Sequence, residues 1–170
     1  MRITRISHLN VNCRALTRSR PFYEELLGLT AGVRTAPAPQ DGTAFQLGKR
    51  IAWDAWILHD PRGFDDVTLD LLEWLDPQPV GAAATLPHQL GFSKLRFHTD
   101  HLDLLHARCT RARVAGLTPI ASGYTDSVTI ARRFRCQDPD GTLLEFTDGP
   151  AFRFAHVTIN CGDLARARTF

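Results

Sequence analysis

The chain has 170 residues, 44% of them hydrophobic, which suits one globular domain or slightly more. Its 20 basic and 18 acidic residues nearly cancel, so no broad field of one sign favours nucleic acid or an anionic membrane. No apolar run is long enough to span a bilayer, and the first residues lack the apolar core of a signal peptide. We therefore expect a cytoplasmic protein with neither a nucleic-acid partner nor a membrane partner.

The first part of the chain predicts a strand, a helix and three further strands. Residues 3–12 alternate apolar and polar side chains, as a half-buried strand does. A stripe of apolar residues at helical spacing follows over 14–29, and Pro21 marks where the helix proper is expected to begin. The next strands are expected over 30–35, 44–58 and 67–75, before a proline- and alanine-rich stretch that ends at residue 90.

The rest of the chain repeats this order. A strand is expected over 91–99 and a helix over 101–115, followed by strands near 118–122, 128–136 and 142–147. Residues 8–22 also recur, shifted by 148, as 156–170, with His, Asn, Cys, Leu, Arg and Phe at matching places. We therefore predict a first unit over 1–76, a linker over 77–90, a second unit over 91–150 and the start of a truncated third unit over 151–170.

The third stretch allows two interpretations. A strand with a partial helix cannot bury a core by itself, so we expect this chain to be the first half of a protein about twice as long. A natural tail is the alternative. In either case the strand over 153–161 is expected to lack a partner in this chain, so it could pair with another copy and form a homodimer.

Two motifs carry a family resemblance: "SHLNVN" opens the first unit, and "DPDGTLLEF" closes the second. Together with the duplicated layout they resemble the vicinal oxygen chelate superfamily, which includes glyoxalases, bleomycin resistance proteins and type I extradiol dioxygenases. The resemblance implies an α+β fold in which two tandem βαβββ units pair their sheets into one cup-shaped mixed sheet. It also implies that a small-molecule ligand lies inside the cup.

Because side chains alternate along a strand, parity sorts those that face the cup from those that pack under the helices. Leu71-Leu72-Glu73-Trp74 resembles Leu143-Leu144-Glu145-Phe146, so Glu73 is predicted to be the counterpart of Glu145. Trp53 and Trp56 differ in parity, so one is expected to line the cup and the other to pack in the core. The candidate cup-lining residues are His8, Asn10, Trp53, Trp56, Glu73, Lys94, Arg96, His98 and Glu145.

The resemblance implies metal ligands at such positions in metal-dependent members. The glyoxalase-like pattern takes one ligand from each of four strands, and the dioxygenase pattern takes a histidine from each opening strand and a glutamate from the last. Here Lys94 stands where the second histidine is expected, and a protonated lysine has no lone pair for a metal. We therefore predict no metal cofactor, with Lys94 pairing Glu145 instead. The alternative is a divalent metal (Fe, Mn, Ni, Co or Zn) on His8, Glu73 and Glu145, while His156 would be a ligand only in a completed second cup.

Two hypotheses about function follow. The first is a metal-free cup that binds a small molecule or supports a catalytic second half. The second is a divalent-metal-dependent enzyme, such as a dioxygenase, an isomerase, a transferase or a glyoxalase-type lyase, and no catalytic residue is assigned. The basic run 131–136 is interpreted as a solvated strand, with attraction of an anionic substrate by Arg133 or Arg135 as the alternative.

Overall fold

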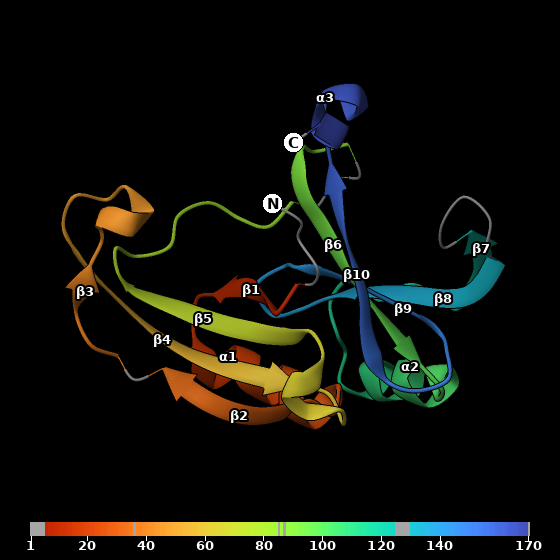
Figure 1. Cartoon of the computed structure of the whole chain (residues 1–170). Helices are drawn as coiled ribbons and strands as arrows, with labels where there is room; N and C mark the ends of the chain where they lie inside the picture. Colours follow the sequence, from red (N-terminus) through yellow and green to blue (C-terminus); the bar gives the residue numbers. More distant parts are fainter. Residues whose placement is uncertain (1–5, 36, 85, 87, 125–129, 170) are drawn as a thin grey trace. The chain divides into compact units, whose positions relative to one another are not determined.

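The computed structural model describes residues 6–35, 37–84, 86, 88–124 and 130–169. The chain forms two compact units, Met1–Gly81 (unit 1) and Ala82–Phe170 (unit 2). Each unit is an α+β layer, with one mixed sheet and short helices (Figure 1). No helix in the described ranges is both long and apolar enough to cross a membrane.

The sheet of unit 1 has the strand order β1-β5-β4-β2, and a short strand, β3, pairs with β4. Strand β1 runs parallel to β5, whereas the other neighbours are antiparallel. The long predicted strand over 44–58 begins only at residue 50, because Thr43–Phe45 form a 3₁₀ turn. The strands are β1 (His8–Cys13), β2 (Thr30–Thr35), β3 (Gln40–Asp41), β4 (Arg50–His59) and β5 (Thr68–Asp76).

The first helix begins earlier than predicted. Helix α1 (Leu16–Pro21) contains the proline instead of starting at it, and a π-helical turn, Phe22–Leu26, continues it. Since proline has no N–H to donate, a change of hydrogen-bond pattern directly after it is an ordinary outcome. Helix α1 packs against β5 (Figure 1), and Leu71 of β5 and Tyr23 of the π-helical turn are fully buried in the core of unit 1.

The sheet of unit 2 has the strand order β10-β6-β9-β8-β7, with β6 parallel to β9 and the other pairs antiparallel. Helix α2 (Leu102–Arg111) stops before the predicted end at residue 115, and Arg113 just beyond it has a left-handed backbone with φ 53°. A last helix, α3, spans Leu164–Thr169. The strands are β6 (Gly91–Thr99), β7 (Ala121–Tyr124), β8 (Ile130–Gln137), β9 (Leu143–Asp148) and β10 (Arg153–Asn160).

Strand β10 is the strand that was expected to lack a partner, and that expectation is wrong. It runs antiparallel to β6 along the edge of the unit 2 sheet (Figure 1). Residues 151–170 therefore belong to the compact unit 2. As a result, β10 adds its own side chains to both faces of this sheet.

One face of the unit 2 sheet is apolar and is covered by α2. The rings of Phe97, Phe134 and Phe146 stack there, and His106 of α2 meets Phe134 edge-on. Leu95 and Leu144 are fully buried on the same side. Because the strands alternate, the polar residues between these positions are turned to the opposite face, which we call the open face of unit 2.

Candidate functional site

Strand register brings one carboxylate to the centre of the open face of unit 2. The β6–β9 pairing sets Arg96 opposite Glu145, and the β8–β9 pairing sets Arg135 opposite the same residue from the other side. Lys94 lies two residues before Arg96, so it shares the face. The two strands that flank β9, β6 and β8, therefore both direct cationic side chains at Glu145.

Both oxygens of Glu145 are engaged by cations. Its Oε1 accepts hydrogen bonds from Lys94 Nζ at 2.9 Å and from Arg96 Nε at 2.7 Å. Its Oε2 accepts one from Arg135 Nε at 2.8 Å, and Arg133 Nη1 lies 3.7 Å from that oxygen. Such charge-assisted bonds are stronger than neutral ones and fix the geometry of all partners.

The ion pairs around Glu145 are largely buried, so they affect the pKa values of their members. The side chain of Glu145 has no exposed surface, and that of Arg96 is only 4% exposed. Loss of solvation by itself would raise the pKa of Glu145, but the hydrogen bonds from Lys94 and Arg135 outweigh it and hold that pKa at about 2. Burial lowers the pKa of Lys94, and its bond to Glu145 works against that shift. Glu145 is thus an ionised carboxylate at any pH near neutrality.

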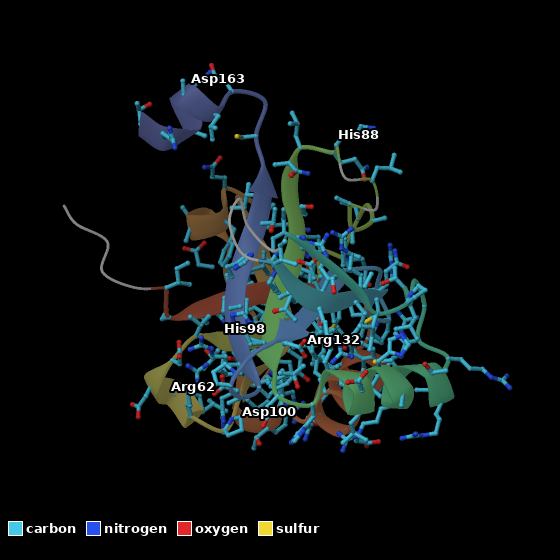
Figure 2. The ribbon with its side chains drawn as sticks, turned by 90° about the vertical axis from the view of Figure 1, so that its right-hand side faces the viewer. Arg62, His88, His98, Asp100, Arg132 and Asp163 are labelled. Carbon is cyan, nitrogen blue, oxygen red and sulfur yellow. The ribbon has the colours of Figure 1, made fainter. Side chains whose placement is uncertain are left out.

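Strand β10 adds one histidine, His156, and one arginine, Arg153, to this face. His156 is opposite Arg96, and Arg153 is opposite His98, which is labelled in Figure 2. Loss of solvation, followed by the nearby positive charges, lowers the pKa of both His98 and His156, so both imidazoles are neutral near pH 7. His98 Nδ1 lies 2.9 Å from Thr147 Oγ1. His156, expected to have no visible partner in this chain, lies in the same sheet as the Glu145 cluster.

In unit 1, the sheet face that α1 does not cover carries a different carboxylate, Asp70, and we call it the open face of unit 1. In register terms, Asn10 of β1 is opposite Asp70 of β5, as Arg96 is opposite Glu145 in unit 2. Asn10 Nδ2 donates to Asp70 Oδ2 at 3.0 Å, whereas Asp70 Oδ1 is buried with no hydrogen-bond partner among the described residues. Burial raises the pKa of Asp70, although His8 and Asn10 act against that shift.

Glu73 does not line this face, so the prediction for it is wrong. Its Oε2 accepts a hydrogen bond from the backbone N–H of Leu16 at 2.7 Å, at the first residue of α1. It therefore lies on the helix-covered side and caps an N–H that the helix itself leaves unpaired. The similarity of the two Leu-Leu-Glu stretches misled the sequence comparison, because the structural counterpart of Glu145 is Asp70, three residues earlier and hence of opposite parity.

The two tryptophans of β4 point to opposite faces, as their parity predicts. Trp53 packs against Trp74 and Phe45, and Trp74 Nε1 donates to Asn12 Oδ1 on the same face as Asn10. Trp56 is on the other face, with the guanidinium of Arg20 from α1 4.0 Å from its ring centre. Including Trp56 among the cup-lining residues is therefore wrong, because that side chain packs under the helix.

The residues proposed as metal ligands do not fit a metal ion. Glu73 is committed to the start of α1, and both oxygens of Glu145 already accept from cationic side chains. Within the part of the chain that the structure describes, no three His, Cys, Asp or Glu side chains gather closely enough to hold a metal. The divalent-metal set of His8, Glu73 and Glu145 therefore has one ligand on the wrong face and another enclosed by positive charge.

Sequence reasoning missed Asp70 and Arg153 and gave Arg135 only as an alternative. Asp70 could have been found from parity, because alternation along the strand puts Asp70 and Glu73 on opposite faces of the sheet. Arg153 could not have been found, since its place depends on β10 pairing with β6, a contact between segments more than fifty residues apart. Long-range pairing of this kind leaves no local pattern in the sequence.

Residues 5–146 match the family model of the Glyoxalase/Bleomycin resistance protein/Dioxygenase superfamily. The chain belongs to that superfamily. No curated protein is similar enough to this superfamily member to count as a relative. The family agrees with the resemblance found in the opening and closing motifs, which is therefore confirmed.

Solved structures agree on the fold. A glyoxalase family protein from Bacillus cereus matches with a TM-score of 0.72 at 20% identity, over 87% of this chain and 95% of that one. Glyoxalase I from Zea mays matches with a TM-score of 0.68 at 18% identity, over 96% of this chain but 52% of its own. A glyoxalase family protein from Enterococcus faecalis matches with a TM-score of 0.58 at 19% identity, over 84% and 96%. This superfamily member therefore shares the glyoxalase fold and spans about half of the maize chain.

Proposed function

We propose that this superfamily member binds a small molecule on the open face of unit 2 without a metal cofactor. The observation that carries the proposal is the 2.9 Å hydrogen bond from Lys94 Nζ to Glu145 Oε1. Lys94 supplies beside the carboxylate the positive charge that a divalent cation would otherwise supply. The proposed function is therefore that of a binding module. In a longer chain, the same module would support a separate catalytic half.

The position of the other cations supports the proposal. Arg96 and Arg135 hold Glu145 from the two neighbouring strands, so the carboxylate would still be enclosed by positive charge if Lys94 turned away. A metal ion would have to displace two guanidinium groups that cannot lose their charge. The alternative, a metal-dependent dioxygenase, isomerase or transferase, requires carboxylates that a metal can reach, and Glu73 and Glu145 are both engaged.

Metal content tests the proposal directly. The purified protein is incubated in turn with Fe(II), Mn(II), Ni(II), Co(II) and Zn(II), freed of unbound ions and measured by mass spectrometry. We expect far less than one metal per chain. Lys94→His, which restores the histidine of the metal-dependent pattern, is expected to bind no better, because Arg96 and Arg135 still occupy Glu145. One metal per chain in the native protein, lost in His8→Ala, would overturn the proposal.

Two further predictions remain part of this proposal. A cytoplasmic location fits Cys109, Cys136 and Cys161, which form no disulfide. A homodimer through β10 is compatible with its position, because β10 is the last strand of its sheet and its outer side could accept another strand. The molecular mass in solution, measured by light scattering, tests the dimer.

A further inference from the structure

We propose that the ligand of the open face of unit 2 carries a phosphate or carboxylate group, and that it is held by Lys94 and Arg135 beside Glu145 and by Arg153 further along the same face. This inference rests on the proposed function and names the chemical class of its ligand. Three separate observations lead to it: the balance of charge on the face, the remaining N–H donors around Glu145, and a buried guanidinium nitrogen that has no acceptor within the described part of the chain.

The balance of charge on this face is strongly positive. The five strands of the sheet contain two carboxylates, Glu145 and Asp148. Asp148 is 3.9 Å from Arg132, which also bonds Asp103 of α2 and so belongs to the helix-covered face. Glu145 is thus the one carboxylate that these described strands turn to the open face. It is contacted there by Lys94, Arg96 and Arg135, and one negative charge cannot neutralise three positive ones.

The cations around Glu145 keep donors beyond those that the carboxylate uses. Arg135 reaches Glu145 through Nε, and its two terminal nitrogens have no hydrogen-bond partner among the described residues. Lys94 gives one of its three N–H groups to Glu145. Because these two side chains bond opposite oxygens of one carboxylate, their charged heads flank it and can meet the same incoming oxyanion. The Arg135 side chain is 39% exposed and that of Lys94 is 13% exposed, so a ligand can reach them from solvent.

Arg153 provides the independent observation. Its Nε is buried, and no group among the described residues accepts a hydrogen bond from it. An unpaired buried donor on a charged group is costly, and such groups in native proteins call for an explanation. Arg153 is opposite His98 on the open face, and its charge contributes to lowering the pKa of that histidine. An oxygen of a bound anion is the acceptor that this nitrogen lacks.

Other ligand classes fit less well. A cationic ligand would meet repulsion from every charged side chain on the face except the enclosed Glu145. A neutral ligand would leave the remaining donors of Lys94 and Arg135 without charged acceptors and would not account for the buried Nε of Arg153. Guanidinium groups bind planar or tetrahedral oxyanions through paired N–H donors, which favours a phosphate or a carboxylate.

The test uses matched probes at about 0.15 M salt, where charges on the surface are screened beyond roughly 8 Å. Phenyl phosphate and benzoate represent the two anionic groups, and benzyl alcohol and benzamide are their neutral counterparts. Binding is measured by isothermal titration calorimetry, and the site is located by protein NMR. We expect the anions to bind at one site on β6, β8 and β10 and the neutral probes to bind at least about tenfold more weakly. The stronger of the two anions identifies the preferred group.

Two arginines on the same strand provide the matched control. Arg135→Gln and Arg132→Gln remove the same charge from positions three residues apart in β8, but Arg132, labelled in Figure 2, bonds Asp103 of α2. We expect Arg135→Gln to weaken anion binding about tenfold and Arg132→Gln to change it less than about twofold. Arg153→Gln is expected to weaken binding with no loss of thermal stability, because it removes an unpaired donor.

The outcomes separate this inference from the proposed function. Equal binding of charged and neutral probes, or equal loss in Arg135→Gln and Arg132→Gln, would overturn the anion site while leaving a metal-free binding module intact. One metal per chain would overturn the proposed function itself. If Arg135→Gln failed to fold, as judged by circular dichroism, Arg153→Gln would decide the question, and unchanged anion binding in that variant would count against the site.

Discussion

Each unit has a carboxylate at the equivalent position of its open face, Asp70 in unit 1 and Glu145 in unit 2. The pKa values of these two carboxyls shift in opposite directions. In unit 2 the neighbouring strands present Lys94, Arg96 and Arg135 to Glu145, and the pKa of that carboxyl falls to about 2. In unit 1 the neighbour of Asp70 is the neutral amide of Asn10, one oxygen has no described partner, and the pKa of the carboxyl rises. Burial by itself raises the pKa of both carboxyls, so the opposite outcomes come from the side chains across the ladder.

The comparison shows that a fold can keep its framework while exchanging the chemistry of its faces. Register alone puts an acidic residue of the closing strand opposite a residue of the opening strand in each unit. Whether that acid is an anion held by cations or a partly buried carboxyl beside a neutral amide depends on the side chains of the neighbouring strands. The same two positions could therefore support different ligands in different members of one fold.

The largest effect is expected from removing the charge of Glu145. Glu145→Gln would leave Lys94, Arg96 and Arg135 around a neutral amide, and Arg96 is almost fully buried. Breaking a buried ion pair on one side costs roughly 3–5 kcal/mol, so we expect a loss of that size in the free energy of unfolding near pH 7. Urea unfolding followed by circular dichroism measures it. A loss below about 1 kcal/mol, the value of an exposed ion pair, would show that the cluster is solvated.

Acid should remove the same contribution. Because the pKa of Glu145 is lowered in the folded state from 4.5 to about 2, its stabilisation is present above pH 4.5 and is lost as the pH falls from there toward 2. We expect the difference in unfolding free energy between the native protein and Glu145→Gln to be constant above about pH 6 and to shrink steadily below about pH 4.5. Unfolding curves at a series of pH values test this, and a constant difference at all pH values would contradict it.

A smaller loss is expected at Glu73, which the structure moves from the open face to the start of α1. Glu73→Ala removes the acceptor for the N–H of Leu16 and should cost about 1 kcal/mol, as the loss of a helix cap does. Glu73→Gln keeps an acceptor and is the matched control, with a smaller expected loss. Thermal unfolding of both variants measures the effect. No change in Glu73→Ala would argue against the capping role.

The smallest effect, and one of opposite sign, is expected at Asp70. Since its pKa is raised in the folded state, the ionised form opposes folding above its ordinary pKa of 3.8, and this opposition disappears as the pH falls below that value. Asp70→Asn should therefore leave stability near pH 7 unchanged or slightly increased, in contrast to Glu145→Gln. Denaturation of the two variants side by side tests the contrast. A clear loss of stability in Asp70→Asn would mean that both carboxylates are held in the same way.

Much of this protein follows from its sequence alone, because short-range patterns report on short-range structure. Alternation and helical spacing predicted the strand-helix-strand order of both units, and the repeated opening and closing motifs predicted the superfamily. The substitution of Lys94 for histidine predicted its pairing with Glu145, which the structure contains. The first two conclusions needed only short-range patterns and a motif with its repeat, whereas the pairing of Lys94 with Glu145 came from the ligand positions that the resemblance implies.

Register and long-range pairing were decided by the tertiary structure. Which carboxylate of β5 matches Glu145 depends on how β1 lies against β5, and a shift of three residues moves Glu73 to the helix side and brings Asp70 forward. The addition of β10 to the edge of β6 brings Arg153 and His156 to the face that holds Lys94. Pairing between distant strands is selected by the packing of the whole sheet. The sequence therefore determined which residues belong to the site, and the tertiary structure determined which side chains lie next to one another.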